Sequence, residues 1–419
     1  MRPVSGGIDF GTSNSTVGVM TNGKPRLVAL EGAEPTLPSA VFFNFENNTT
    51  CFGRKAIASY AGNVEGRLLR ALKSVLGTSL MADKTRIKAR SIAFTEIIGS
   101  FLEHLKSALD RNVGQPVEHV VLGRPVRFVD QDDTADQSAQ DALEQAARKL
   151  GFRNIEFQFE PIAAALDYEQ SVSREELALI IDIGGGTSDF SIVRVSPERA
   201  ATSDRKDDIL ASSGVHIGGT DFDRLFSISQ IMPHLGYLSP TKDGKRNLPA
   251  GYFIDLATWP RINLLYTTKA KNDLRSIRFE AARPDLVERL MDIVEHKQGH
   301  ALAGEVERSK IDLTDQDAAR MALTLTDEVL DIALTRQGFD DSIERAVTTI
   351  SQTITATLAD AGVDASRITT LFLTGGSTSV PLLKETVLAM FPGVNVVAGD
   401  MFGSVGLGLA LDAQRKFGA

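Results

Sequence analysis

The chain has 419 residues, 42% of them hydrophobic and 24% charged, so it can bury a full core, which we expect in two lobes. Its formal net charge of −9 disfavours nucleic acid and anionic membranes as partners. A single cysteine, Cys51, excludes an internal disulfide, and neither an apolar leader nor a membrane-length apolar run stands out. These features predict a cytoplasmic protein.

The first notable stretch is residues 6–20, GGIDFGTSNSTVGVM. It reads as a short apolar strand that ends in Asp9, a Gly-Thr-Ser turn and a second strand. Glycine leaves no Cβ between the backbone and a ligand, and successive exposed N–H groups can form a nest for phosphate oxygens. Residues 18–25 also spell G-x-x-x-x-G-K, but Pro25 stands where a P-loop needs Ser or Thr, and a strand follows instead of a helix. Asn22-Gly23 predicts a hairpin turn there.

Residues 39–98 form a mixed segment, with a strand predicted over 40–45 and a basic helix over 66–76 that contains Lys73. Apolar residues at helical spacing predict an amphipathic helix over 94–109. A strand over 119–122 then leads to the sequence Gly-Arg-Pro.

The acidic stretch 130–141 is similar to a calcium loop, but Ala135 stands where such a loop needs Gly, and Asp141 where it needs Glu. We expect these carboxylates near the N-terminus of a helix that runs to Leu150, where the helix dipole favours them. Glu160 and Pro161 begin the next helix, whose alanines suit close packing between two lobes.

The stretch 179–193, LIIDIGGGTSDFSIV, repeats the design of the first hairpin. Its strand reaches Asp182, three glycines follow, and the return strand begins after Asp189. Two carboxylates beside a phosphate nest would repel bare phosphate, so they imply a divalent cation between them and it. A lone hairpin of this kind is often only a glycine-rich turn, but two with matching aspartates indicate an internal repeat, with two lobes facing a shared cleft.

Further glycine turns follow at Gly218-Gly219 and, after a buried strand, at Gly375-Gly376, where Pro381 opens a helix. Residues 239–258 are rich in loop signals, and 403–413 predict a helix of small residues. His296 and His300 are four apart, but Gly299 weakens that helix and no third ligand is near, so we expect surface histidines instead of a metal pair.

Taken together, the motifs GIDFGTSNSTV, EPIAAALDY, IIDIGGGTSDFSIV, IGGTDFD and LTGGSTSVP occur in an order that resembles the nucleotide-binding domain of the Hsp70 chaperones, within the actin/hexokinase/Hsp70 ATPase superfamily. The likeness covers nearly the whole chain. It is greatest to short bacterial YegD-type relatives, which share the sequence GRP before the acidic helix and FGSV near the end.

The resemblance implies an α/β, two-lobed actin-like ATPase fold, in which each lobe has a ribonuclease-H-like mixed sheet and the nucleotide lies in the central cleft. Lobe I would comprise residues 1–175 and 396–419, with 39–98 as its smaller subdomain. Lobe II would comprise residues 176–395, with about 221–316 as its smaller subdomain.

The resemblance also implies roles for particular residues with ATP or ADP and Mg²⁺ as cofactors. Asp9 and Asp182 would hold the metal, largely through its waters, and Lys73 would reach the γ-phosphate. Glu160, Thr187 and Asp189 would orient water and metal. The remaining nucleotide contacts would come from Gly11, Thr12, Ser13, Asn14, Gly184, Gly185, Gly186, Gly218, Gly219, Glu307, Lys310, Ile311, Thr314, Gly375, Gly376, Ser377 and Ser379. Glu307 and Lys310 would hold the ribose.

Two positions depart from the family pattern. Typical Hsp70 proteins stack two arginines on the adenine ring, and the matching positions here hold Ile311 and Ser379. We therefore expect weaker ATP binding and less discrimination against GTP.

The function expected from the resemblance is slow Mg-dependent ATP hydrolysis in a nucleotide-gated, chaperone-related module without a peptide-binding domain. Its partner would be another protein, a co-chaperone or a client. Two alternatives remain open at this point: a small-molecule, sugar-type kinase of the same fold, and a nucleotide-binding filament or scaffold protein.

Overall fold

The computed structural model describes residues 4–62, 64–129, 132–200, 202, 204–397 and 403–418, so Asp130 at the start of the acidic stretch and Phe402 of FGSV lie outside the described residues. The chain divides into two compact units. Unit 1 comprises Met1–His216, Gln352–Thr378 and Val387–Ala419, and unit 2 comprises Ile217–Ser351 and Ser379–Thr386. Unit 2 contains the predicted smaller subdomain 221–316, and the lobe boundary after residue 175 stays a prediction.

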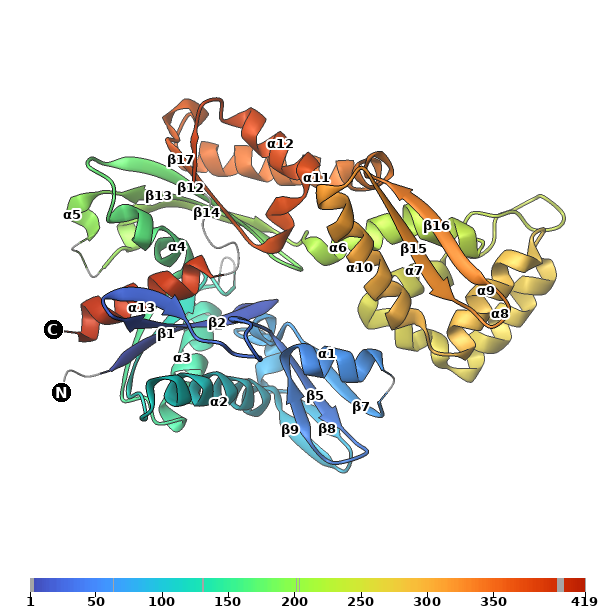
Figure 1. The fold of residues 1–419 in the computed structure, drawn as a ribbon, viewed down its shortest axis with the longest axis horizontal. Coiled ribbons are helices and arrows are strands. Elements are labelled where there is room, and N and C mark those ends of the chain that lie inside the picture. The colour runs from blue at the N-terminus through green and yellow to red at the C-terminus, as the bar shows by residue number, and fades with distance from the viewer. Residues whose placement is uncertain are drawn as a thin grey trace. The chain divides into compact units, whose positions relative to one another are not determined.

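Unit 1 contains two large sheets, one with β1 and β2 and the other with β12, β13, β14 and β17 (Figure 1). The two sheets have the same strand order. The first runs β3-β2-β1-β10-β11, with β4 beside β2, and the second runs β14-β13-β12-β17-β18. In both, the first three strands are antiparallel and the last two join in parallel. The strands are β1 (Ser5–Asp9), β2 (Asn14–Thr21), β3 (Lys24–Leu27), β4 (Thr36–Pro38), β10 (His119–Arg124), β11 (Asn154–Phe159), β12 (Glu176–Ile183), β13 (Ser188–Val195), β14 (Ile209–Val215), β17 (Thr370–Thr374) and β18 (Asn395–Val397). The internal repeat predicted from the sequence is therefore confirmed as a repeated sheet.

Local sequence explains the burial of strand β12 and the turn between β2 and β3. Strand β12 is buried along almost its whole length, as expected for a strand flanked on both sides and packed on both faces. The turn between β2 and β3 has positive φ at both Asn22 and Gly23, 52° and 76°, which matches the twist of a two-residue hairpin. The P-loop-like sequence is thus a strand, a turn and a strand.

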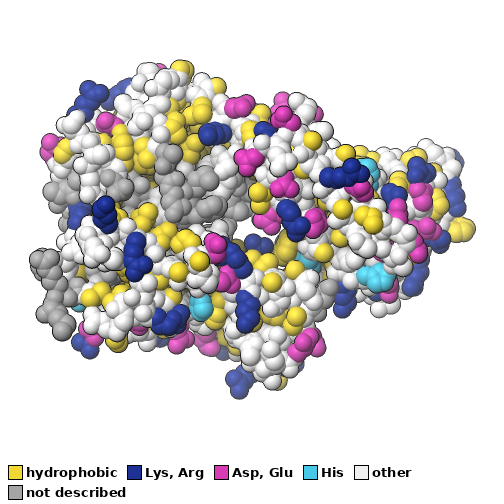
Figure 2. Space-filling model, in the orientation of Figure 1, with side chains coloured by type: hydrophobic (Ala, Val, Ile, Leu, Met, Phe, Trp, Pro, Cys, Tyr) yellow, Lys and Arg dark blue, Asp and Glu magenta, His cyan; other side chains and the backbone are white. Residues whose placement is uncertain are grey.

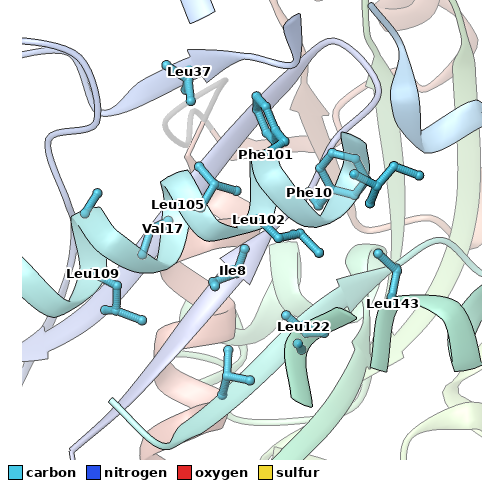
Figure 3. Close-up of a cluster of buried hydrophobic side chains, with 14 of the residues drawn as sticks. Ile8, Phe10, Val17, Leu37, Phe101, Leu102, Leu105, Leu109, Leu122 and Leu143 are labelled. Atoms are coloured by element: carbon cyan, nitrogen blue, oxygen red, sulfur yellow. The ribbon is translucent and has the colours of Figure 1, made fainter. Parts of the chain in front are cut away.

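Helices cover these sheets: α2 (Phe94–Val113), α3 (Asp133–Lys149), α4 (Glu160–Glu169), α5 (Pro197–Ala200) and α13 (Ser404–Phe417), while α11 (Arg336–Asp360) and α12 (Pro381–Met390) are divided between the units. The apolar face of α2 packs on β1 and β2, where Phe101, Leu105 and Leu109 lie against Ile8 and Val17 (Figure 3). The carboxylate of Asp132 accepts a hydrogen bond from the Ala135 N–H and caps α3, as the acidic stretch predicts.

The small residues of α13 allow it to pack closely on its neighbours. A Cβ at Gly406 would lie 2.3 Å from Oγ1 of Thr16 on β2. A Cβ at Gly408 would lie only 1.8 Å from the carbonyl oxygen of Ala163 on α4. No side chain fits at such distances, so the predicted helix of small residues is confirmed, and glycine is required at both contacts.

The helix predicted over 66–76 is wrong. Within 39–98 the strands β5 (Ala40–Asn44), β6 (Thr50–Phe52) and β7 (Gly66–Arg70) form one sheet beside α1 (Gly53–Ala61), and β8 (Lys84–Ile87) pairs with β9 (Arg90–Ala93). Because β7 pairs with β5 across five residues, sheet hydrogen bonds override its helical propensity. Ala71 then takes a left-handed conformation, and only Leu72–Val75 form a short 3₁₀ turn.

Unit 2 is mainly helical, with α6 (Gly219–Phe226), α7 (Gly251–Ala257), α8 (Thr268–Glu280), α9 (Pro284–Glu295) and α10 (Gly299–Asp315), followed by the hairpin of β15 (Ala318–Thr324) and β16 (Val329–Thr335). Helix α7 lies inside the stretch that reads as loops. Charged side chains of both signs are interspersed on the face drawn in Figure 2.

The two histidines lie on separate elements. His296 follows the end of α9 and is exposed, whereas His300 lies in α10, is buried, and packs edge-on against the ring of Trp259. The prediction of a surface location is therefore wrong for His300. In the described part of the chain, no three His, Cys, Asp or Glu residues group as metal ligands, and no helix is long and apolar enough to cross a membrane.

Candidate functional site

Two carboxylates occupy equivalent places in the repeated hairpins of unit 1. Asp9 ends β1, and Asp182 is the penultimate residue of β12. Burial, together with the negative charge of Glu160, raises the pKa of Asp9 to about 8. Burial and the nearby carboxylate of Asp189 raise the pKa of Asp182 to about 7. The negative charge of Asp182 also raises the pKa of Asp9, so a cation between the two carboxylates would favour their ionised forms.

This donor set fits magnesium. Mg²⁺ usually keeps several waters and binds proteins through one or two carboxylates together with substrate phosphates. Asp9 and Asp182 would supply two such oxygen ligands, and the glycine turns that follow them have the composition of a phosphate nest. The residues present therefore match a metal–phosphate group better than a cation bound by protein ligands alone.

The turns that follow the two carboxylates lie against each other. In the first, a Cβ at Gly11 would lie 2.1 Å from the carbonyl oxygen of Asn14, so only glycine fits that turn. In the second, the Gly184 N–H donates to the carbonyl oxygen of Thr187 at 3.0 Å and closes the turn. The Gly185 N–H donates to Oγ of Ser13 at 3.0 Å, which joins the second turn directly to the first.

A third glycine turn completes this group from β17. Gly375 has a φ of 81°, and a Cβ there would lie 2.3 Å from the carbonyl oxygen of Ile183 and 2.8 Å from Oδ1 of Asp182. The hydroxyl of Ser377 donates to the carbonyl oxygen of Gly184 at 3.2 Å. The turn Gly375–Ser377 is therefore packed on the second hairpin, beside its carboxylate.

Lys73 is a buried lysine that forms an ion pair with Glu160. The left-handed backbone at Ala71 and the 3₁₀ turn after it direct this lysine into unit 1, where its side chain is only 8% exposed. Burial would lower the pKa of Lys73, but the carboxylates of Glu160 and Asp9 outweigh it and raise the pKa above its usual value. Lys73 is thus a fixed positive charge among these carboxylates, and not a solvated helix lysine.

Sheet topology explains how Glu160 and Asp9 come to the same place. Glu160 begins α4, directly after β11, and Asp9 ends the parallel strand two places away in the sheet. A Cβ at Gly123, on the strand between them, would lie 3.5 Å from Cγ of Glu160 and 3.6 Å from Oδ1 of Asp9. The two acidic side chains therefore meet beside Gly123, over the end of β10.

Of the remaining predicted residues, Thr12, Gly186 and Gly376 lie in the glycine turns of unit 1, and the others belong to unit 2. Gly218 caps α6, and its N–H donates a hydrogen bond to Oδ2 of Asp221 at 3.1 Å. Lys310 pairs with Oδ1 of Asp223 at 2.8 Å and donates to the carbonyl oxygen of Gly219 at 3.4 Å. Helical spacing places Glu307, Lys310, Ile311 and Thr314 on one face of α10, with Glu307 and Ile311 exposed, and Ser379 also belongs to this unit.

Some residues of the site carry no motif that would reveal them. The hydroxyl of Ser39 donates to the carbonyl oxygen of Gly11 at 2.6 Å and lies 2.9 Å from the hydroxyl of Ser15. A hydrogen bond from Thr374 lowers the pKa of Asp182 and so partly offsets its burial. Thr374 can be identified from the sequence, because it directly precedes the turn Gly375-Gly376. Ser39 stands in a loop sequence that contains no recognisable motif.

Two mixed sheets of one topology, each with a glycine hairpin and an aspartate at its first strand end, define the class of actin-like ATPase folds. The family model for Hsp70 protein matches residues 5–231 and 287–410 of this chain. The chain therefore belongs to the Hsp70 family, whose fold is the two-lobed, actin-like α/β ATPase fold. It carries an Hsp70-type ATP-binding module.

Proposed function

We propose that this protein binds Mg·ATP at the paired hairpins of unit 1 and hydrolyses it slowly to ADP. The observation that carries the proposal is the pair Asp9 and Asp182, at equivalent strand ends, with raised pKa values and with Lys73 beside them. Membership of an ATPase family supports the same reaction. Bound magnesium would neutralise charge on the phosphate oxygens and on both carboxylates.

The protein groups each have a proposed task in that reaction. Backbone N–H groups of the turns after Asp9 and Asp182 would hold phosphate oxygens, since hydrogen-bond donors fixed in advance stabilise charge without reorganising. Lys73 would contribute positive charge toward the terminal phosphate. Glu160, which holds Lys73 by an ion pair, and Thr187 would orient the attacking water.

In unit 2, the proposed contacts are Lys310 and Glu307 for the ribose and Ile311, an exposed residue of α10, for the base. We further propose that binding and hydrolysis of ATP regulate contact with another protein in the cytoplasm. Membership of the Hsp70 family supports that role. Fold similarity supports the nucleotide site more strongly than it supports the cellular task.

The substitution Asp182→Asn tests the proposal. It removes one carboxylate charge and keeps the shape of the side chain, so we expect Mg-dependent ATP hydrolysis to fall to background. Folding should be retained, since burial already disfavours the ionised form. Phosphate release would be measured with Mg²⁺ and with EDTA, and Asp312→Asn, at an exposed position of α10, is the matched control.

Hydrolysis by the Asp182→Asn protein at the wild-type rate would refute the proposed metal site. Adding a panel of sugars to the same assay tests for a kinase. Phosphorylated sugar formed faster than free phosphate would replace hydrolysis with phosphoryl transfer to a small molecule.

A further inference from the structure

A buried polar network connects the C-terminal helix α13 to the junction between β11 and α4. Asp412 on α13 is 1% exposed and Gln158 on β11 is 4% exposed. The side-chain amide of Gln158 donates to Oδ2 of Asp412 at 3.1 Å. Oε1 of the same side chain accepts a hydrogen bond from the Phe159 N–H at 3.0 Å. Phe159 is the N-cap residue of α4, so this one side chain holds the backbone at which the helix begins.

Lys416 adds a second connection one helical turn further along α13. Its Nζ lies 3.2 Å from Oδ2 of Asp412 and donates to the carbonyl oxygen of Phe157 at 3.2 Å. The ends of α13 and β11 are therefore joined at two successive residues of the strand. A buried carboxylate is costly unless it is well paired, and apolar residues of similar size are often no less stable, so stability alone does not explain this network.

The same helix also contacts the first hairpin. A Cβ at Gly7 on β1 would lie 2.4 Å from Cβ of Leu409, so α13 packs directly on the strand that ends in Asp9. Helix α13 thus contacts both β1, which carries Asp9, and the β11–α4 junction, which carries Glu160. Close packing holds α13 against α4, and the directional hydrogen bonds to Gln158 and Phe157 add a fixed position for the end of β11.

We infer that Gln158 and Asp412 are positioning residues for Glu160, an inference that rests on the proposed hydrolysis. Glu160 lies two residues after Gln158 and pairs with Lys73. By fixing the first turn of α4, the network sets where the Glu160 carboxylate lies relative to Lys73 and Asp9. Small misplacements of catalytic groups lower rates strongly, because reaction depends on the alignment of the reacting atoms.

Gln158→Met is the first test, since methionine keeps the length of the side chain and removes both hydrogen bonds. In single-turnover hydrolysis of Mg·ATP we expect a rate at least about ten-fold lower, with the dissociation constant of ATP changed less than about two-fold. Glu156→Gln is the matched control on the same strand, because Glu156 is exposed and lies 3.8 Å from Lys416. Its rate should equal that of the wild type.

A second pair of variants separates positioning from a general loss of stability. Gln158→Glu places two carboxylates side by side and should lower the hydrolysis rate. Adding Asp412→Asn gives a pair in which residue 158 carries the carboxylate and residue 412 the amide. A hydrogen bond can form again between the two side chains, so the double substitution should recover most of the rate. Recovery at unchanged ATP affinity shows that the hydrogen bond itself matters, and it decides the question even if Gln158→Met does not fold.

A third measurement combines Gln158→Met with Glu160→Gln. If Gln158 acts through Glu160, the double variant should have the rate of Glu160→Gln alone. The inference would be overturned if the two substitutions lowered the rate independently, so that their effects multiplied. It would also be overturned by a wild-type rate for Gln158→Met, or by no recovery of the rate in Gln158→Glu with Asp412→Asn. If the wild type did not hydrolyse ATP, or if Asp182→Asn left its rate unchanged, the proposed function would be overturned, and this inference with it.

Discussion

At the residue scale, the site combines groups that could not be placed by their local sequence alone. Lys73 lies in a sequence that reads as an ordinary helix, yet its side chain is buried and paired with Glu160. The cost of burying an ammonium group is offset only because carboxylates surround it. A lysine held in this way is a fixed charge, which is what stabilisation of a developing phosphate charge needs.

We expect Lys73→Ala to lower the hydrolysis rate by about 10²–10³-fold, as loss of transition-state charge stabilisation does. ATP affinity should change much less, because the turns and the metal would still hold the phosphates. Single-turnover rates and calorimetric titration would separate the two effects. Lys55→Ala, at an exposed position of α1, is the control, and a near-normal rate for Lys73→Ala would exclude its proposed role.

The base site gives a second prediction at this scale. Ile311 is 57% exposed and stands where typical relatives have a stacking arginine. Each lost guanidinium–ring contact weakens binding by roughly 0.5–2 kcal/mol. We therefore expect Ile311→Arg to tighten ATP binding by up to about 30-fold and to increase selectivity over GTP.

Calorimetric titrations with ATP, ADP and GTP would measure this change. Val329→Arg is the matched control, since Val329 is an apolar side chain of unit 2 with 55% exposure. Equal effects of the two arginines would show that added positive charge, and not stacking at Ile311, strengthens binding. Tight, adenine-selective binding by the wild type would show that other residues enclose the base.

At the scale of elements, α13 holds unit 1 together by close backbone contacts. Gly406 and Gly408 let this helix approach β2 and α4 to distances at which a Cβ would collide with Thr16 and Ala163. The contact with Ala163 involves its carbonyl oxygen, which belongs to the backbone of α4 and cannot move aside as a side-chain end can. Close packing of this kind is sensitive to the addition of a single methyl group.

Gly408→Ala should therefore lower the free energy of unfolding by about 1–3 kcal/mol or more. Gly304→Ala is a matched control in α10, because no atom lies within 4 Å of the Cβ it would add. That control should gain about 0.5–1 kcal/mol, since alanine favours a helix over glycine. Urea unfolding of both variants would measure the difference. Equal stabilities would mean that α13 does not pack on α4 as closely as described.

At the scale of the whole molecule, the two buried carboxylates connect stability to pH. Asp9 and Asp182 have pKa values of about 8 and about 7 in the folded protein, above the usual 3.8. The folded state therefore binds their protons more tightly than the unfolded chain does. This contribution to stability is fully present below about pH 4 and is lost as the pH rises to about 7–8.

Without metal, the wild type should become less stable between about pH 6 and about pH 8.5, by at most about 1.4 kcal/mol per pH unit for each carboxyl. Asp182→Asn should show a weaker dependence, because one of the two groups no longer titrates. Urea unfolding in EDTA at both pH values would give the difference between the proteins. Identical pH dependence of wild type and variant would contradict the raised pKa of Asp182.

Several features of this protein follow from the sequence by itself. The two hairpins, with Asp9 and Asp182 at equivalent strand ends, are encoded locally by apolar runs, aspartates and glycines, because turn conformation depends on few neighbouring residues. Local patterns of the same kind exclude a P-loop at residues 18–25, predict the cap of α3 and identify the family. These features have short-range causes, which is why one chain without its structure reveals them.

Tertiary structure decided the rest. Residues 66–70 form a strand because β5 lies beside them, and that pairing orients the turn that buries Lys73 against Glu160. His300 is buried because Trp259 packs on it. Likewise, Gln158 meets Asp412, 254 positions away in the chain, because α13 packs across β1 and α4. Such contacts depend on which elements become neighbours in space, and the local preferences of a sequence do not contain that information.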